Sequence, residues 1–389
     1  MAPRGVNRKR LLVVSNGYGE DVAVAQVVRA LPVEDLDVIA YPLVGLGLHY
    51  PPGVRFLDPR REFPSGGFGW IAGWRSLRHD LAQGLARFWL TQRRTLRSQR
   101  GRVDLVLVAG DVYCLAMASG AGGPIVYLAW TKSHYVAPYN LVEVCMLRRL
   151  ASQVFTRDEV TAAALRSRGV RAEFQGFWIM DALRFSGETF GLPEDHPVIT
   201  VLPGSKLPAF DNLIPLLRAA NMAAARTTPV PSVLLAWAPQ LPLPRLRDTI
   251  QAHGGVWVDP SRFRFQGILV TVTTSHFADT LARATVVLGM AGAAHEQAAG
   301  LGKPIVAFPG RGPQFRPRFL QEQRRLLGDA LVAAATWEEA GIRLAALLAD
   351  PKERERRGQS GRARHGGPSG VAPIARYLLE RLDRNSLSA

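Results

Sequence analysis

The sequence predicts an α/β protein built from two doubly wound domains that face each other across a cleft. Three observations support this prediction: short apolar segments alternate with helical segments, the alternation stops at a polar stretch with Gly and Pro at 184–197, and it then begins again. Continuously apolar strands of this kind belong to parallel sheets that helices cover on both faces. A chain of 389 residues also exceeds the length that one hydrophobic core usually serves.

The first domain is expected over residues 1–183, and a linker follows at 184–197. The strands predicted in it are aliphatic or β-branched runs, at 11–15, 37–41, 104–110, 124–130 and 153–157. Helices are predicted between them, notably at 21–31, 76–98 and 159–168. The uncharged stretch 112–131 carries Ser-Gly-Ala-Gly-Gly-Pro in its middle, so it predicts a helix, a turn and a buried strand rather than a membrane span.

The second domain is expected over residues 198–368. Its predicted strands repeat the pattern of the first domain, at 198–204, 232–238, 268–273, 285–290 and 304–310. A Gly-rich turn then precedes a helix within 369–389, which we expect to pack back on the first domain rather than to form an exposed tail. Ligands of open parallel sheets bind outside the carboxyl ends of the strands, so two facing sheets predict a shared site in the cleft.

The composition excludes several classes of protein. Hydrophobic residues make up 47% and charged residues 21% of the chain, which is ordinary for a globular protein and excludes wholesale disorder. The two cysteines, Cys114 and Cys145, lie in apolar segments without a C-x-x-C pair, so no disulfide framework, zinc site or other cofactor is expected. The apolar run at 11–14 is too short for a signal peptide, which predicts a cytoplasmic protein.

The loop after the first predicted strand is a candidate ligand site. Gly17 and Gly19 permit positive φ and close backbone approach, and Asn16 precedes them. The helix that begins there offers unpaired N–H groups to an anionic or hydroxylated ligand. The spacing lacks the full G-x-G-x-x-G pattern of a dinucleotide site. Glu20 and Asp21 are also acids that the dipole of a helix N-terminus favours, so a purely structural role stays open for them.

The second domain begins with a matching loop after its first strand. Gly204 lets the backbone approach a ligand, Ser205 can donate a hydrogen bond, and Lys206 supplies a positive charge, which together suit a phosphate or diphosphate. The loop is not a Walker loop, because the G-x-x-x-x-G-K-[ST] spacing is missing. A plain turn between a strand and a helix is the alternative.

A third loop leads from the strand at 285–290 into a helix. Small residues, among them Gly292 and Ala293, leave room for a phosphate against the helix N-terminus. Glu296 lies one turn into the helix, beside Gln297, and its carboxylate can accept hydrogen bonds from both hydroxyls of a ribose. His295 is either a ligand-binding group or a half-buried helix residue.

Six sequence motifs, in the same order along the chain as in a known family, give the chain a resemblance to that family. The chain is similar to glycosyltransferases of the GT-B fold, which has two Rossmann-like domains, and most closely to the lipid-A-disaccharide synthases and their related branch. The motifs that carry the resemblance are Asn16-Gly-Tyr-Gly-Glu-Asp21, Asp111 after its strand, Gly176 with Asp181, LPGSK at 202–206, the Ala-Ala-His-Glu-Gln helix at 293–297 and GLGKPIVAFPG at 300–310. The GPQF at 312–315 is similar to the related branch.

The resemblance implies an inverting, metal-independent transfer of a hexose or N-acetylhexosamine from a UDP-sugar donor. It implies that Glu296 binds the nucleotide ribose and that Gly204, Ser205, Gly292 and Ala293 lie near the diphosphate. Inversion at an anomeric carbon needs a base for the acceptor hydroxyl. Asp111 is the candidate base and Glu20 the other candidate, while a helix N-cap is the alternative role for Asp111. The chain departs from the synthase pattern mostly in the first domain, so the donor is better supported than the acceptor.

The segment 60–102 holds half of the net charge of +16, because ten Arg stand there against Glu62 and Asp80. Aromatic residues are interleaved with the Arg, which is typical of a segment on an anionic membrane surface. A lipid or glycolipid acceptor would be reached there by a peripherally bound enzyme. The expected contacts are Phe68, Trp70, Trp74, Arg75 and Arg78. Aromatic packing in the domain core, with solvated Arg outside, is the alternative.

Two further functions stay open. A UDP-sugar 2-epimerase shares the two-domain cleft, but it needs carboxylates on both sides of the sugar C2 instead of an acceptor groove. A basic protein can also bind nucleic acid without catalysis. No helix-turn-helix, RRM or KH pattern occurs in the sequence, so a nucleic-acid partner is not expected. The excess of Arg over Lys can also reflect codon bias alone.

Overall fold

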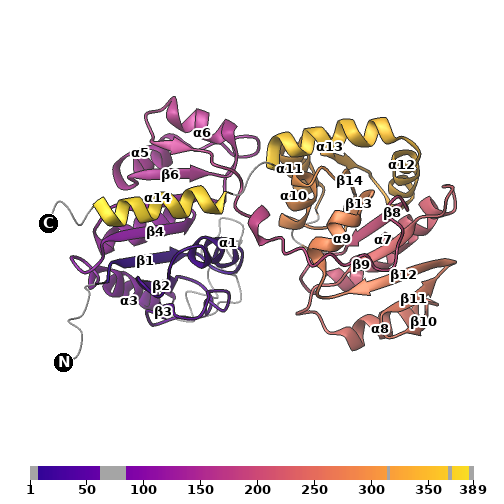
Figure 1. Cartoon of the computed structure of the whole chain (residues 1–389), viewed down its shortest axis with the longest axis horizontal. Helices are drawn as coiled ribbons and strands as arrows, with labels where there is room; N and C mark the ends of the chain where they lie inside the picture. The colour runs from indigo at the N-terminus through magenta and orange to yellow at the C-terminus, as the bar shows by residue number, and fades with distance from the viewer. Residues whose placement is uncertain (1–7, 62–84, 313–315, 367–369, 385–389) are drawn as a thin grey trace. The chain divides into compact units, whose positions relative to one another are not determined.

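The computed structural model describes residues 8–61, 85–312, 316–366 and 370–384. The chain forms two compact α/β units (Figure 1): the first joins the residues up to Ala182 with the segment from Pro368 onward, and the second is Leu183–Gly367. The predicted class of two doubly wound α/β domains is confirmed. The expected linker at 184–197 is part of the second unit, where Ser186 and Gly187 donate backbone hydrogen bonds to the carboxylate of Asp279.

The first unit contains a seven-stranded sheet in the order β3-β2-β1-β4-β5-β6-β7, in which all neighbouring strands are parallel. The strands are β1 (Arg10–Ser15), β2 (Asp37–Pro42), β3 (Arg55–Phe56), β4 (Leu105–Gly110), β5 (Ile125–Ala129), β6 (Gln153–Thr156) and β7 (Ala172–Glu173). The α-helices are α1 (Tyr18–Arg29), α3 (Leu85–Arg97), α4 (Val112–Ala118), α5 (Leu141–Leu150), α6 (Glu159–Arg166) and α14 (Val371–Arg384). The helix, turn and buried strand predicted for 112–131 are present as α4, a 3-10 turn and β5.

The second unit contains an eight-stranded sheet in the order β10-β11-β12-β9-β8-β13-β14-β15. The strands are β8 (Val198–Leu202), β9 (Ser232–Ala236), β10 (Val256–Asp259), β11 (Arg262–Phe265), β12 (Ile268–Thr273), β13 (Val286–Gly289), β14 (Ile305–Ala307) and β15 (Leu331–Ala333). The α-helices are α7 (Ala209–Ala224), α8 (Leu243–Ala252), α9 (Phe277–Arg283), α10 (Ala293–Gly300), α11 (Pro317–Leu327), α12 (Trp337–Ala349) and α13 (Pro351–His365).

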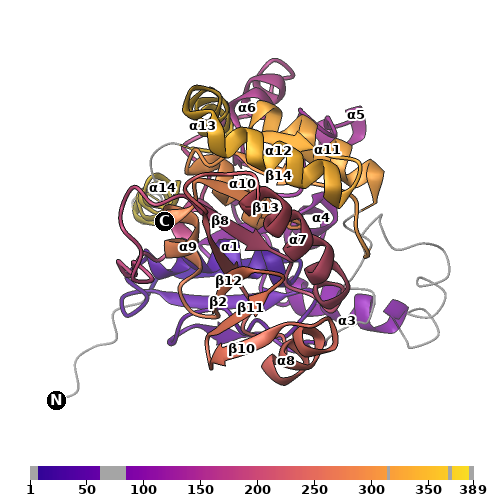
Figure 2. The same cartoon turned by 90° about the vertical axis from the view of Figure 1, so that its right-hand side faces the viewer.

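The two antiparallel pairs of the second sheet lie at one of its edges, where β10, β11 and β12 form a meander beside α8 (Figure 2). Strands β10 and β11 are not among the strands predicted from the sequence. Their residues alternate between exposed and more buried positions, as in VWVD and RFRF, because one face of this edge packs on the core and the other is solvated. Charged residues therefore interrupt the apolar run that reveals the interior strands.

Helix α14 completes the core on one face of the first sheet. Its residues Ile374, Leu378 and Leu382 are buried together with Val24 of α1 and Leu107 of β4. The N-terminus of α14 is also tied to the same unit. The Asp181 carboxylate accepts the backbone N–H groups of Gly370 and Val371 at 3.1 and 3.3 Å.

Candidate functional site

The order of the strands reverses direction between β1 and β4 in the first unit, and ligands of doubly wound sheets bind at such a point. Asn16 follows β1 and Asp111 follows β4, so both lie at the carboxyl edge of the sheet. The two loops approach closely, since a Cβ on Gly110 would lie 3.1 Å from the Cβ of Asn16. The predicted residues of this loop pair are therefore neighbours in space.

Gly17 shapes the entry into α1. It precedes the helix with a φ of 111°, a conformation that favours glycine, and a Cβ there would lie 3.3 Å from the carbonyl oxygen of Val44. Gly17 is the N-cap residue and has no side chain with which to cap this helix end. Gly19 is exposed, and a Cβ there would have no neighbour within 4 Å, so the backbone fold does not explain this glycine.

Glu20 and Asp111 form a pair of neighbouring carboxylates at this edge. Burial raises the pKa of Glu20 to about 7, and the negative charges of Asp111 and Asp21 also raise it, against a backbone hydrogen bond that lowers it. Asp111 is the N-cap of α4, because its Oδ1 accepts the backbone N–H of Cys114 at 3.0 Å. Burial raises the pKa of Asp111 as well. A carboxyl group with a pKa near 7 can both release and take up a proton at neutral pH.

Two buried oxygen atoms beside this pair have no hydrogen-bond partner among the described residues. They are Oδ1 of Asn16 and Oδ1 of Asp21. The Asp21 side chain is only 2% exposed, and burial raises its pKa against a hydrogen bond with Ser15. The hydroxyl oxygen of Ser15 in turn lies 2.8 Å from the hydroxyl oxygen of Tyr50, within hydrogen-bond distance. A ligand that donates hydrogen bonds would satisfy both oxygens.

Ser15 and Tyr50 are not among the site residues predicted from the sequence. The hydroxyl of Tyr50 reaches the loop from a segment 35 residues further along the chain. No local motif marks such a tertiary contact, so only the structure reveals it.

The second unit reverses its strand order between β8 and β13, and the two predicted phosphate loops follow these strands. The backbone N–H of Met290 donates to the carbonyl oxygen of Leu202 at 2.8 Å, which holds the loops together. Gly204 has a φ of 104°. Ser205 and Lys206 are exposed, so their polar groups are accessible to a ligand.

The N-terminus of α10 lies at the same edge of the sheet. Gly292 is the N-cap residue and has no side chain with which to cap the helix, and Ala293 is exposed. His295 is 2% exposed, and neither ring nitrogen has a hydrogen-bond partner among the described residues. Burial lowers the pKa of His295 to about 3, so its ring is neutral at pH 7. A Cβ on Gly289 would lie 2.5 Å from Nε2 of this ring.

Glu296 and Gln297 are both buried, since each residue is only 7% exposed. Oε2 of Glu296 lies 3.9 Å from Nδ1 of His365, which is itself buried at the end of α13. His365 is not among the site residues predicted from the sequence. The contact of Glu296 with a ribose stays a prediction.

The remaining predictions concern contacts with a membrane and the binding of a metal. Phe68, Trp70, Trp74, Arg75 and Arg78, predicted to touch the membrane, belong to the undescribed range 62–84. In the neighbouring helix α3, Trp89 packs against the core of the first unit. No group of three or more His, Cys, Asp or Glu suited to a metal occurs in the described ranges. No helix in the described part of the chain has the length and apolarity needed to cross a membrane.

Comparison with known proteins assigns the fold. S. aureus MnaA in complex with UDP superposes with a TM-score of 0.56 at 16% identity, covering 96% of this chain and 97% of that one. A putative UDP-N-acetylglucosamine 2-epimerase from Listeria monocytogenes gives 0.56 at 14% identity, covering 98% of both chains. The glycotransferase of kitacinnamycin gives 0.61 at 15% identity, covering 97% of this chain and all of that one. The fold is of the GT-B type.

The GT-B prediction is thus confirmed at the level of fold. No protein-family model matches the chain, and no curated protein matches it. The finer resemblance to lipid-A-disaccharide synthases stays a prediction, because the matched structures support the GT-B fold alone.

Proposed function

We propose that this GT-B protein is an enzyme that acts on a UDP-sugar, with Glu20 as the group that transfers the proton. The observation that carries the proposal is the pair Glu20 and Asp111, in which the pKa of Glu20 is raised to about 7. A general acid–base group works best when its pKa is near the operating pH. Solved proteins of the same fold include one in complex with UDP.

Epimerisation at C2 of the UDP-sugar is the first candidate reaction. A base takes the C2 proton while the C–H electron pair forms a C1–C2 double bond and UDP leaves C1. Addition of a proton to the other face of C2, with return of UDP to C1, gives the epimer, so the reaction needs more than one proton-transfer group. Glu20, Asp21 and Asp111 supply three carboxylates within one loop pair, and the pKa of each is raised. The structurally similar proteins named above include a putative UDP-N-acetylglucosamine 2-epimerase.

Inverting glycosyl transfer is the second candidate reaction. It needs a single base for the acceptor hydroxyl, and Glu20 or Asp111 would serve. The basic, aromatic segment 60–102 favours it, because that composition suits a lipid or glycolipid acceptor at an anionic membrane surface. The glycotransferase of kitacinnamycin shares the fold.

Both candidate reactions separate the sugar from a diphosphate that gains negative charge. Gly204, Ser205 and Lys206, together with the uncapped N-terminus of α10, would hold that charge through backbone N–H groups and one ammonium group. Glu296 is the proposed ribose contact. No metal enters this proposal, because the helix end and Lys206 supply the positive charge.

Incubation with UDP-N-acetylglucosamine in D2O separates the two reactions. Epimerisation replaces the C2 hydrogen by deuterium, which proton NMR and mass spectrometry detect without any acceptor. Transfer leaves that hydrogen in place and releases UDP only when an acceptor is added. Glu20→Gln should abolish either activity, while Glu338→Gln, at an exposed position of α12, should leave it unchanged.

The same assay is run with UDP-glucose and UDP-galactose after a thermal-shift screen for binding. The absence of a thermal shift with every nucleotide sugar would contradict the proposal. Equal activity of Glu20→Gln and the wild type would remove Glu20 from the reaction.

A further inference from the structure

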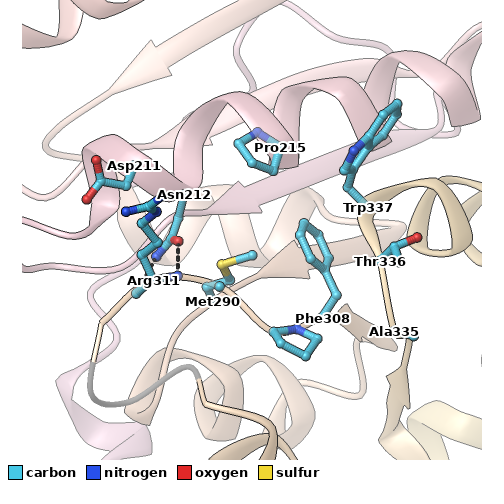
Figure 3. A pocket seen from close by; sticks show the side chains of 11 residues that line it. Asp211, Asn212, Pro215, Met290, Phe308, Arg311, Ala335, Thr336 and Trp337 are labelled. Carbon is cyan, nitrogen blue, oxygen red and sulfur yellow. Dashed lines mark hydrogen bonds between the residues drawn. The ribbon is translucent and has the colours of Figure 1, made fainter.

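A pocket with a volume of about 270 Å³ opens in the second unit, beyond the carboxyl ends of β13 and β14 and beside α7 and α12 (Figure 3). None of the candidate nucleotide-binding residues lines it. Its volume is just below the range of about 300–1,000 Å³ that is typical of sites for drug-sized ligands. The pocket therefore has room for one ring rather than for a nucleotide.

The walls of the pocket are mainly apolar. Phe308 and Met290 come from the ends of β14 and β13, Pro215 comes from α7, and Trp337 begins α12. The indole of Trp337 is half-buried, so part of its surface is accessible. Aromatic and aliphatic walls of this kind suit the C–H face of a saturated ring.

Two opposite charges stand at the other end of the pocket from Trp337 (Figure 3). Asp211 and Arg311 are both exposed, and no hydrogen bond or ion pair joins either side chain to another described residue. The carboxylate accepts hydrogen bonds and the guanidinium donates them. Each charge repels a ligand of its own sign, so the pair favours a neutral ligand that carries several hydroxyl groups.

Asn212 holds this arrangement in place before any ligand binds. Its side chain is 1% exposed, its Oδ1 accepts the backbone N–H of Arg311 at 2.7 Å, and its Nδ2 donates to the carbonyl oxygen of the same residue at 3.0 Å. A Cβ on the preceding Gly310 would collide with the side chain of Met290 and lie 2.6 Å from Oδ1 of Asn212. The loop after β14 is therefore fixed against α7, and binding costs less when a site is preformed.

We propose that this pocket binds a neutral, hydroxylated ring of the size of one monosaccharide, with the apolar face of the ring on Trp337 and Phe308 and its hydroxyl groups on Asp211 and Arg311. This carbohydrate site goes beyond the proposed reaction, and only its assignment to the glycosyl group of a nucleotide sugar rests on the proposed function. The ring belongs either to the glycosyl group of a nucleotide sugar or to a separate glycoside.

Methyl glycosides of glucose, galactose and N-acetylglucosamine test the proposal, because they carry the ring without a nucleotide. Saturation-transfer NMR on the full chain should show contacts from the ring protons of at least one of them. Asp211→Asn, which removes the charge and keeps the size of the side chain, should weaken that binding about fivefold. Asp248→Asn, at an exposed position of α8, is the matched control and should leave the affinity unchanged.

Competition then identifies the source of the ring. If a UDP-sugar displaces the glycoside and UDP alone does not, the ring is the glycosyl group of the nucleotide sugar. If neither displaces it, the pocket serves a separate glycoside, and both results support a carbohydrate site. The proposal is overturned if no glycoside gives saturation transfer, or if Asp211→Asn and Asp248→Asn bind it as the wild type does. UDP-sugar turnover of the wild type is measured separately in D2O, so a protein that turns over a UDP-sugar but binds no glycoside contradicts only the carbohydrate site, and the two proposals fail separately.

Discussion

Nδ1 of His365 lies 3.9 Å from Oε2 of Glu296, and both side chains are buried inside the second unit. His365 is at the end of α13, and Glu296 is in the first turn of α10. The imidazole therefore lies beside the carboxylate that is predicted from the sequence to bind a ribose. At 3.9 Å the two polar groups approach closely without being within hydrogen-bond distance.

Replacement of Glu296 tests its place in the nucleotide site. Glu296→Ala should weaken UDP binding at least about tenfold, because a hydrogen bond to a charged group contributes about 1.5–3 kcal/mol. Isothermal titration calorimetry with UDP measures the loss. Glu338→Ala, on the exposed face of α12, is the control. An unchanged affinity of the Glu296 variant would place the ribose elsewhere.

The pH dependence of turnover tests the role of Glu20. The value of kcat/KM should rise with pH and reach half of its maximum near the pKa of Glu20, about 7, because the base must be deprotonated. Asp111→Asn removes one of the negative charges that raise this pKa, so the midpoint of the residual activity should move to lower pH. A midpoint that stays in place in this variant would argue against coupling between the two carboxylates. Complete loss of turnover with intact UDP affinity would instead make Asp111 the base.

The stability of the protein should also depend on Glu20. Its pKa of about 7 in the folded chain is above the ordinary value of 4.5, so the folded state binds the proton more tightly than the unfolded state does. The wild type therefore loses stability as the pH rises from about 4.5 to about 7. Glu20→Gln avoids this loss. The Tm of the variant should exceed that of the wild type by an amount that grows over this interval and is constant above it. An identical Tm difference at pH of about 4 and about 8 would contradict the raised pKa.

A pair of substitutions tests the packing of His295. Gly289→Ala should lower the free energy of unfolding by about 1–3 kcal/mol, because the added Cβ would lie 2.5 Å from Nε2 of His295. In the double variant Gly289→Ala/His295→Ala, the ring that blocks the Cβ is gone. The double variant should therefore lose less free energy of unfolding than the two single variants lose together. Urea unfolding of the four proteins measures the coupling. Strict additivity would show that the ring does not occupy this position.

Much of the fold can be predicted from the sequence, because the interior strands are continuous apolar runs. Strand β4 at Leu105–Gly110 and β5 at Ile125–Ala129 fall inside the predicted ranges for this reason. The hairpin of β10 and β11 cannot be predicted in the same way, since its solvated face places Arg262 and Arg264 between Phe263 and Phe265.

In the candidate site, too, residues with a local sequence signal can be predicted, and residues that act through distant contacts cannot. Gly17 and Gly204 can be predicted because a positive φ after a strand favours glycine locally. Asn212, Tyr50 and His365 act through partners 99, 35 and 69 residues away in the sequence, so no local pattern marks them. Asp111 takes the N-cap role that the sequence offered as the alternative, and its role as the base stays a prediction.

The return of α14 to the first unit affects the order in which the two cores can form during synthesis. The first unit lacks Ile374, Leu378 and Leu382 until the chain has passed through the whole of the second unit. The ribosome delivers the chain from its N-terminus, so the second unit can close its core while the first is still incomplete, although the first begins earlier. During that interval the apolar surface of α1 and β4 that α14 covers is open to water, and chaperones that hold exposed apolar segments would act there.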